Sequence, residues 1–398
     1  MEKLYYEDVC LRQFTALVER CEARGDLWEI ELNRSAFYPE GGGQPGDTGT
    51  LGEAKVLDTR ETPEGRIVHC CDRPLGVGST VEGEVDWERR LDFMVQHSGE
   101  HIVSGLAHRL FGCDNVGFHM GASVTAIDFN RVLTDAELWE IERRANDIVR
   151  QDFSIEITFP SPEELAKLSY RSKKEIQGQV RIVTIPEADV CACCALHVRR
   201  TGEIGLIKLL SRQKLRQGVR VELVCGKRAY DHIRAVTEQN RAISALLSVP
   251  VTETAAAARR VYQELETLKY RCVGLENRML EAKAESFAGQ KDAVLIEEDL
   301  SGDGARKLCE ALRKRGAENC YVFSGQDGDG YLYAINIAAG NEKDCSRSAV
   351  SESEFREKLK SMNAALSGRG GGRQGFARGR VNCTKAEIEA YFQSGDRV

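Results

Sequence analysis

The sequence lacks the long apolar segments that cross membranes. Its 398 residues contain no run of about 18 or more uncharged apolar residues. The first residues, MEKLYYEDVCLRQ, also lack a basic region followed by an apolar core, so the sequence predicts neither a membrane span nor a signal peptide. We therefore expect a cytoplasmic protein with no membrane partner. Most of its 14 cysteines should then be reduced thiols, buried as small apolar groups or used as metal ligands.

The chain also lacks an overall positive charge, because 62 acidic residues outnumber 55 basic ones. A net charge of −7 argues against indiscriminate binding of nucleic acid. The charge is uneven, however, since residues 167–228 hold 14 Lys and Arg against 5 Asp and Glu. This surplus predicts one basic face on an otherwise acidic protein. The alternative is a solvated surface that happens to be basic.

The pattern along the chain predicts an α+β multidomain fold. Residues 1–90 carry short strand-like runs between Gly/Pro turns, which indicate a small N-terminal β-barrel or sandwich. Residues 91–240 mix helical and strand patterns as in an α+β domain, with capping boxes at Thr134 and Ser161. Residues 241–290 form a long helix, and residues 291–398 alternate strands and helices like a small C-terminal α/β domain.

The long helix carries a heptad pattern. Apolar residues recur at alternating spacings of four and three, with charged residues between them: Val261, Leu265, Leu268, Cys272, Leu275, Met279 and Ala282. The helix could lie on a neighbouring domain or form half of a coiled coil. In the second case the chain would be a homodimer, paired through this helix or through the C-terminal domain.

In the stretch SAFYPEGGGQPGD at positions 35–47, three consecutive glycines follow an aromatic pair, so the backbone can adopt conformations that other residues disfavour. Residues without a Cβ lose the most entropy on folding, so a fold keeps them where the chain bends sharply or approaches something closely. The stretch is therefore either a turn between strands or a loop that contacts a ligand.

Two residue pairs have the spacing of metal ligands. His97 and His101 stand four apart in a helical segment, so both imidazoles project from one face. Cys193 and His197 repeat that spacing in VCACCALHV. Together they form a set of three nitrogens and one sulfur that suits Zn²⁺. The alternatives are a buried cysteine cluster and a redox pair formed by the Cys191–Cys194 motif.

Three motifs in this order resemble the editing domain of alanyl-tRNA synthetases and of free-standing alanyl-tRNA editing proteins: FYPEGGGQPGDTG, HSGEH, and CxxxH followed by TGEIG. The terminal GRGGGRQGFARG is similar to the motif of the C-terminal domain in those synthetases and in long-form editing proteins. The resemblance covers nearly the whole chain. Because the glycine triplet begins at residue 41, we expect no aminoacylation domain and no aminoacylation activity.

The resemblance implies a zinc-dependent deacylase that hydrolyses serine, and also glycine, from mischarged alanine tRNA. It implies His97, His101, Cys193 and His197 as the zinc ligands. Ser35 would lie beside the substrate amino acid, where the family has Thr, and Gln44 would line the same pocket. The bare backbone of Gly42 and Gly43 would let the aminoacyl end come close. Glu100 could carry a proton, and His119 could line the cleft.

Several residues depart from the family pattern. The chain has CCALH where the family has CGGTH, so Cys194, Ala195 and Leu196 could alter the approach of substrate. The closing motif lacks the usual residues after GGR. Its four arginines are Arg369, Arg373, Arg378 and Arg380. They could bind tRNA phosphates, or the segment could be disordered.

Two other functions remain open at this point. HSGEH also satisfies the H-x-x-E-H pattern of inverted zinc peptidases, in which the glutamate activates water. The altered CCALH segment would also be compatible with a non-catalytic tRNA-binding protein that holds a structural zinc.

Overall fold

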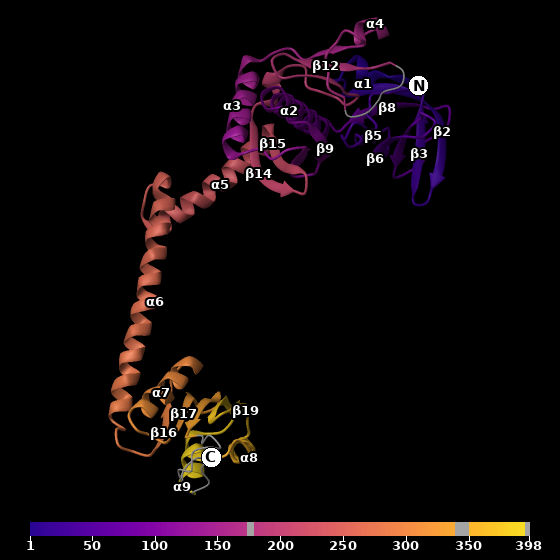
Figure 1. The fold of residues 1–398 in the computed structure, drawn as a ribbon. Coiled ribbons are helices and arrows are strands. Elements are labelled where there is room, and N and C mark those ends of the chain that lie inside the picture. The colour runs from indigo at the N-terminus through magenta and orange to yellow at the C-terminus, as the bar shows by residue number, and fades with distance from the viewer. Residues whose placement is uncertain (173–178, 339–349, 395–398) are drawn as a thin grey trace. The chain divides into compact units, whose positions relative to one another are not determined.

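The computed structural model describes residues 1–172, 179–338 and 350–394 (Figure 1). The chain divides into two compact units, Met1–Ile243 and Ser244–Val398. Within the described residues, helices and strands are mixed in both units, so the predicted α+β class is confirmed. None of the described helices combines the length and the apolar character that a membrane-spanning helix needs.

The first unit begins with a closed β-barrel, which confirms the predicted N-terminal barrel. Its strands follow the order β2-β3-β7-β6-β5-β8. Alternate residues of β2 and β8 are buried, as expected for strands with one face toward an apolar interior. Short β1 (Glu2–Lys3) and β4 (Arg34–Ser35) pair beside it, and α1 (Leu4–Glu7) lies between them in sequence. The barrel strands are β2 (Gln13–Arg24), β3 (Leu27–Leu32), β5 (Gly49–Leu51), β6 (Ala54–Glu61), β7 (Ile67–Cys71) and β8 (Thr80–Val85).

Helix α2 (Trp87–Phe111) is the central element of the rest of this unit. The Asp86 side chain caps its first turn by accepting from the Arg89 backbone N–H, and Gly112 ends it in the left-handed conformation at φ 58°. Apolar side chains of α2 share one core with α3 and with an antiparallel sheet of order β14-β15-β10-β9. These elements are β9 (Asn115–Met120), β10 (Thr125–Phe129), α3 (Asp135–Gln151), β14 (Ile207–Leu215) and β15 (Gly218–Cys225).

A small three-stranded sheet completes the first unit. It consists of β11 (Glu156–Thr158), β12 (Ile182–Ile185) and β13 (Asp189–Ala192). The capping boxes expected at Thr134 and Ser161 are present, and they open α3 and the short α4 (Pro162–Leu165). A 3-10 turn at Thr201–Ile204 precedes β14, and α5 (Gly226–Leu247) follows β15.

The second unit contains a five-stranded sheet of order β16-β17-β18-β20-β19. Helix α7 and the end of α6 cover one face of this sheet, and α8 and α9 cover the other. A 3-10 turn, Val251–Glu253, precedes α6. The elements are α6 (Thr254–Glu285), β16 (Asp292–Glu297), α7 (Gly302–Lys314), β17 (Asn319–Gln326), β18 (Gly330–Ile337), α8 (Glu352–Ala365), β19 (Gly368–Arg373), β20 (Phe376–Val381) and α9 (Lys385–Gln393).

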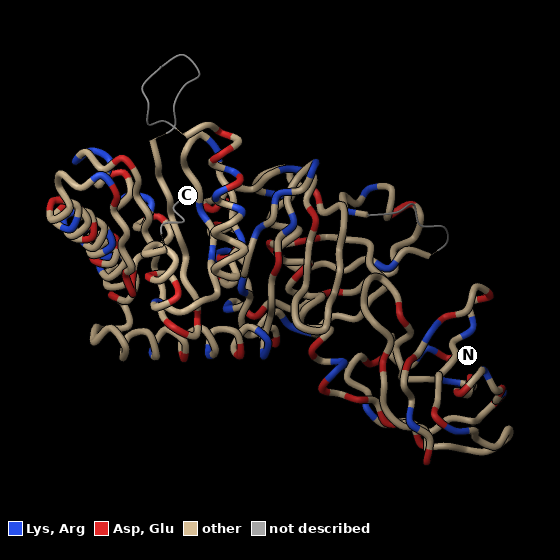
Figure 2. The backbone as a smooth tube through the Cα atoms, turned by 90° about the horizontal axis from the view of Figure 1, so that it is seen from below, with Lys and Arg blue, Asp and Glu red and all other residues tan. Residues whose placement is uncertain are grey.

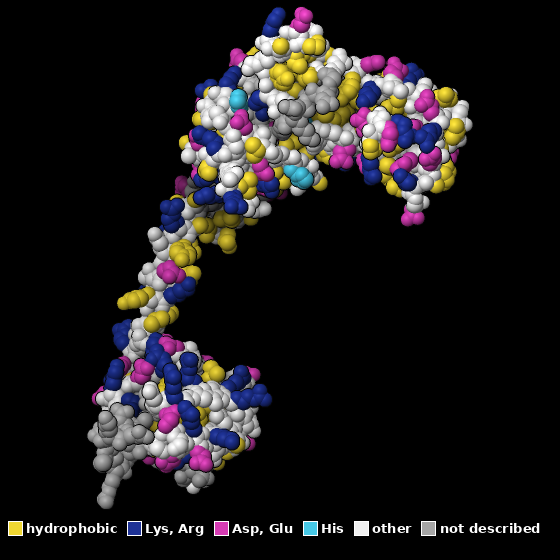
Figure 3. Space-filling model, turned by 45° about the vertical axis from the view of Figure 1, so that its right-hand side comes forward, with side chains coloured by type: hydrophobic (Ala, Val, Ile, Leu, Met, Phe, Trp, Pro, Cys, Tyr) yellow, Lys and Arg dark blue, Asp and Glu magenta, His cyan; other side chains and the backbone are white. Residues whose placement is uncertain are grey.

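Helix α6 contains the whole heptad pattern within its 32 residues. The heptad side chains are mostly exposed, with Leu268 at 53% and Leu275 at 55%, and apolar side chains are visible along this helix in Figure 3. The residues of α6 that pack against α7 and the sheet are others, among them Leu280 and Ala284. The heptad face is therefore not used for packing within the described part of this unit.

The glycine-rich terminal motif forms a hairpin of β19 and β20, which corrects the alternative of a disordered segment. Gln374 and Gly375 make its turn, with positive φ at both. A Cβ at Gly370 would lie 2.1 Å from the Tyr333 hydroxyl oxygen, and one at Gly379 would lie 2.5 Å from it. The glycines are therefore needed because the Tyr333 side chain lies directly against this hairpin.

Candidate metal centre

The structure brings together the four residues that the sequence singled out as ligands. Helix α2 presents His97 and His101 one turn apart, and the segment after β13 carries Cys193 and His197. One ligand atom from each residue lies within 4.8 Å of the others. His97, His101 and His197 are at most 4% exposed, so the cluster is buried.

The ring nitrogens of the cluster have specific partners. His101 Nδ1 donates to Asp189 Oδ2 at 2.9 Å, and His197 Nδ1 lies 3.2 Å from Ser98 Oγ. His97 Nε2 lies 3.4 Å from Cys193 Sγ. His197 Nε2 and His97 Nδ1 are buried and have no hydrogen-bond partner among the described residues. An unpartnered buried nitrogen costs free energy, and a bound cation would satisfy His197 Nε2.

The electrostatics favour the ligand form of the cysteine. Burial alone would raise the pKa of the Cys193 thiol, but the neighbouring His97 and His101 imidazoles hold that pKa well below its ordinary value. Burial also lowers the pKa of His197 to about 3, so its imidazole is neutral near pH 7. Although burial lowers the pKa of His101, the neighbouring Cys193 and Asp189 hold it well above its ordinary value, so a metal ion would displace a proton from that ring. A thiolate and neutral imidazoles are the forms that bind metal ions. The residues therefore fit a divalent cation that accepts nitrogen and sulfur ligands.

The glycine triplet lies against residues that neighbour this cluster. A Cβ at Gly42 would be 3.1 Å from Cys194 Sγ and 3.2 Å from Ala195 Cβ. A Cβ at Gly43 would be 2.6 Å from the Phe118 ring, and that ring is in edge contact with His97, with centroids 5.2 Å apart. The loop thus closely approaches the segment that carries Cys193 and His197, and Phe118 separates it from the His97 ring, which explains why it lacks side chains.

Two of the three altered residues in CCALH do not enter the site. Ala195 and Leu196 are fully buried and belong to the core of the first unit. Cys194 is exposed and lies beside Gly42. Of this segment's departures from the family pattern, Cys194 and Ala195 lie against Gly42, and only the Cys194 side chain is exposed there.

Gln44 and Ser35 are both completely buried, but they differ in their partners. Neither amide atom of the Gln44 side chain has a hydrogen-bond partner among the described residues. The Ser35 hydroxyl donates to His69 Nε2 at 2.8 Å and accepts from the Phe37 backbone N–H. Burial lowers the pKa of His69 to about 4, so this ring is neutral and its Nδ1 donates to the Ile30 carbonyl. Gln44 has hydrogen-bonding capacity left for a ligand, whereas the Ser35 hydroxyl is already engaged.

A buried ion pair that the sequence analysis missed fixes the glycine loop. Arg90 on α2 is fully buried, and its Nε donates to Asp47 Oδ2 at 2.9 Å. The same carboxylate accepts from the Tyr38 backbone N–H at 2.6 Å. The pair ties both ends of the 38–47 loop to the helix that carries His97. The only sign of this ion pair in the sequence is an arginine seven residues before His97.

Glu100 and His119 occupy different surroundings. Glu100 is 2% exposed, and its Oε1 accepts from Ser104 Oγ and Asn115 Nδ2, both at 2.5 Å. Its Oε2 lies 3.9 Å from His101 Nε2, so it faces the cluster. His119 is exposed, and it alternates on β9 with Phe118, so its side chain points away from the ring that touches His97. The structure does not bring His119 to the cluster.

Many basic residues of the segment 167–228 form ion pairs in the part of it that the structure describes. Figure 2 shows basic and acidic residues interspersed along the chain. Many of the surplus cations form ion pairs with carboxylates, most of them from outside the segment: Arg171–Asp189, Arg199–Asp8, Arg200–Asp152, Lys208–Glu142, Arg212–Asp135, Arg220–Asp128, Lys227–Asp231 and Arg228–Asp92. These ion pairs offset much of the basic charge among the described residues of the segment, and the basic face stays a prediction.

The four arginines of the closing motif lie in the second unit. Arg369 is directly opposite Arg380 in the register of β19 and β20, and Arg373 and Arg378 share their face of the hairpin because residues two apart in a strand point the same way. All four are exposed. Among the described residues, only Arg380 has a partner, the Asp329 carbonyl.

Comparisons with known proteins agree with this arrangement. Residues 180–221 match the family described as the threonyl and alanyl tRNA synthetase second additional domain, a segment that contains Cys193 and His197. Two alanine–tRNA ligases are 32% identical to the chain: that of Pyrococcus abyssi over 97% of it, and that of Halobacterium salinarum over 84%. The chain spans only 42% and 38% of these two ligases.

A shorter relative matches from end to end. The alanyl-tRNA editing protein AlaX-L of Pyrococcus horikoshii is 30% identical over 404 residues, which cover 98% of this chain and 96% of the relative. The sequence resemblance to long-form editing proteins is thereby confirmed. The chain belongs to the family of alanyl-tRNA editing proteins.

Proposed function

We propose that this protein is a zinc-dependent deacylase that removes serine, and also glycine, from mischarged alanine tRNA. Water adds to the ester carbonyl, the bond to the tRNA ribose oxygen breaks, and free amino acid and uncharged tRNA are released. The convergence of His97, His101, Cys193 and His197 beside Gly42 is the single observation that carries the proposal. The family supports it independently, since the relative of similar length is an editing protein.

The four ligand residues would hold the zinc ion. When bound, zinc supplies Lewis-acid polarisation of a carbonyl or a water of lowered pKa. The chain's own residues would orient the ester, exclude bulk water and move protons. Because the cluster is buried beside a loop without side chains, an aminoacyl end could approach it along the backbone of Gly42 and Gly43.

Gln44 would distinguish serine from alanine. A pocket built to reject an added hydroxyl discriminates weakly, whereas a site that hydrogen-bonds a hydroxyl rejects a ligand without one much more strongly. The buried Gln44 amide has both its donor and its acceptor available among the described residues. Ser35 would contribute less to this discrimination, because a ligand that reached the Ser35 hydroxyl would first have to displace its hydrogen bond to His69.

Glu100 is the candidate proton carrier. Ser104 and Asn115 fix one of its carboxylate oxygens, and the other faces His101 Nε2. The same glutamate would serve a peptidase of the H-x-x-E-H type, but Cys193 and His197 complete the ligand set without the downstream carboxylate that such an enzyme uses.

The exposed arginine face of the β19–β20 hairpin would bind tRNA phosphates. None of its four arginines has an acidic partner among the described residues, and only Arg380 has a partner there, the Asp329 carbonyl, so their charges are available to a polyanion. The heptad face of α6 would pair two chains as a coiled coil, since its apolar side chains are exposed.

Release of amino acid from Ser-tRNA and Ala-tRNA, both carried on alanine tRNA, tests the proposal. We expect the zinc-loaded chain to release serine and to leave alanine attached. Single-turnover conditions with excess protein distinguish slow hydrolysis from binding alone. Equal release of both amino acids, or release of neither, would overturn the proposed activity.

A further inference from the structure

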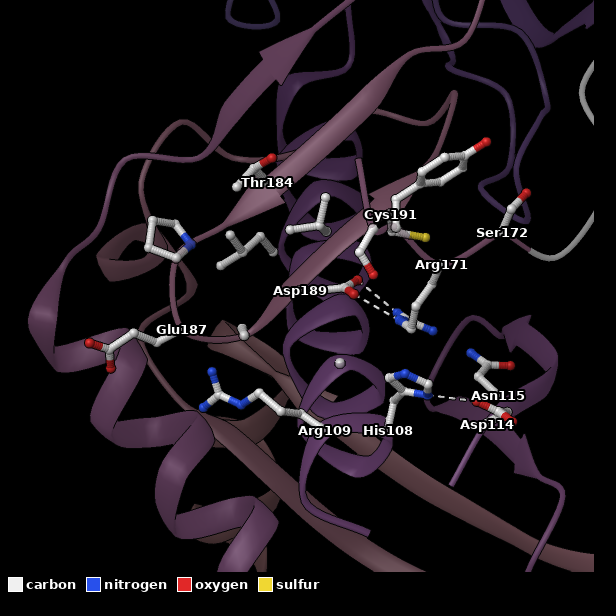
Figure 4. A pocket seen from close by; sticks show the side chains of 17 residues that line it. His108, Arg109, Asp114, Asn115, Arg171, Ser172, Thr184, Glu187, Asp189 and Cys191 are labelled. Atoms are coloured by element: carbon white, nitrogen blue, oxygen red, sulfur yellow. Dashed lines mark hydrogen bonds and ion pairs between the residues drawn. The ribbon is translucent and has the colours of Figure 1, made fainter. Parts of the chain in front are cut away.

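A hollow of about 670 Å³ lies beside Asp189, and its lining includes an ion pair that none of the motifs predicted (Figure 4). Arg171 donates to Asp189 through two parallel hydrogen bonds, Nε to Oδ1 and Nη2 to Oδ2, both at 2.7 Å. The Asp189 side chain is 1% exposed, and that of Arg171 is 16% exposed. Asp189 therefore has a fixed orientation, because a bidentate arginine defines the plane of a carboxylate.

The same carboxylate touches the metal cluster. Asp189 Oδ2 accepts from His101 Nδ1 at 2.9 Å. In the neutral ring, a proton on Nδ1 leaves Nε2 without one and able to bind a cation. Of the three clustered imidazoles, only His101 has a carboxylate partner on its second nitrogen, since His197 meets the Ser98 hydroxyl and His97 Nδ1 has no partner among the described residues.

The backbone fixes both members of the ion pair. The Arg171 N–H donates to the Val190 carbonyl, and its own carbonyl accepts from the Ala192 N–H, so Arg171 is bound to β13 on both sides of Cys191. Gly105, one turn after His101, lets β13 approach α2, since a Cβ there would lie 2.4 Å from the Ala188 carbonyl oxygen. Strand β13 thus positions the carboxylate at residue 189, and the chain places the ligand thiol four residues later.

We propose that Asp189, clamped by Arg171, is a positioning residue that holds His101 in the tautomer with Nε2 free and so strengthens zinc binding by the cluster. The inference rests on the proposed zinc site, but not on the proposed hydrolysis. A carboxylate behind a ligand histidine fixes the ring and raises its basicity, and its loss typically lowers metal affinity by roughly 10- to 100-fold.

Zinc affinity of the full chain, measured by competition with a chromophoric chelator in the absence of tRNA, tests this proposal. We expect Asp189→Asn to lower zinc affinity by roughly 10- to 100-fold. Arg171→Lys keeps the positive charge but cannot make the two parallel hydrogen bonds to Asp189, so it should cause a smaller loss of zinc affinity. Asp114→Asn is the matched control, because Asp114 pairs with His108 Nδ1 at 2.7 Å on the exposed end of the same helix. It should bind zinc like the unmodified chain.

A second measurement separates positioning from general destabilisation. In zinc-loaded protein labelled with ¹⁵N at its 7 histidines, His101 should carry its proton on Nδ1. Asp189→Asn should move the His101 ring signals and leave those of His69 unchanged. If a folded Asp189→Asn binds zinc within about twofold of the unmodified chain, the proposal is overturned while the zinc site stands. If Asp189→Asn does not fold, Arg171→Lys decides: unchanged affinity and unchanged His101 signals overturn the proposal.

Discussion

Removal of the Asp47 carboxylate should destabilise the first unit strongly. The Asp47 side chain is 1% exposed and that of Arg90 is 0% exposed, so neither charge is screened by water. Asp47→Asn keeps the shape of the side chain but leaves the Arg90 guanidinium buried without a counter-charge. Breaking a buried pair in this way costs about 3–5 kcal/mol.

The double variant distinguishes the pair from its individual members. Asp47→Asn combined with Arg90→Met removes both charges, so its cost should be smaller than the sum of the single costs. We expect a coupling free energy of about 1–3 kcal/mol, the size typical of residues in direct contact. The backbone bond from Tyr38 and the contacts of Arg90 with the Leu11 and Ala36 carbonyls account for the remaining loss.

Urea unfolding followed by tryptophan fluorescence provides the assay. The chain's 3 tryptophans, Trp28, Trp87 and Trp139, all lie in the first unit, so the signal reports on that unit within the full chain. Glu238→Gln is the control, because the Arg234–Glu238 pair has side chains 67% and 58% exposed and should contribute less than about 1 kcal/mol. A loss below about 1 kcal/mol for Asp47→Asn, or additive single and double variants, would refute the reasoning.

Three further predictions concern other parts of the molecule. Gly43→Ala should destabilise the first unit by about 1–3 kcal/mol and slow serine release, because the new Cβ overlaps Phe118 at a φ of 84°; unchanged stability and rate would contradict this. The pKa of His69 is about 4 in the folded state and 6.5 in the unfolded state. Between pH 4 and pH 6.5 the unfolded state therefore binds more protons. Stability should thus fall by up to about 3 kcal/mol from pH 6.5 to pH 4, and His69→Gln should flatten the curve in urea titrations. Reversing the charge of Arg369 or Arg378 should weaken tRNA binding and reduce its dependence on salt in filter-binding titrations, with zinc content unchanged.

The sequence predicted the features that depend on local pattern. Short strand-like runs between Gly/Pro turns indicated the barrel, capping residues located α3 and α4, and the spacing of four identified both ligand pairs before any contact between them was known. Such signals are readable because the periodicity of an element is set within a few residues.

The features that the sequence did not predict arise from contacts between distant segments. Arg171 and Asp189 are ordinary charged residues in the sequence, and only the pairing of residue 171 with β13 makes them partners. Ser35 was expected beside a substrate, but folding places its hydroxyl on His69 from another strand. Likewise, Arg199 contributes to the basic surplus in the sequence, but in the structure it forms an ion pair with Asp8, which is distant in sequence.

The dependence of seryl-tRNA hydrolysis on bound zinc tests the central claim most directly. Metal-stripped chain is titrated with zinc, and bound metal and the rate of serine release from alanine tRNA are measured in the same samples. If His97, His101, Cys193 and His197 form the working site, the rate rises in proportion to bound zinc and levels off at one ion per chain, and Cys193→Ala shows neither binding nor release. A rate that is the same with and without zinc would contradict the account.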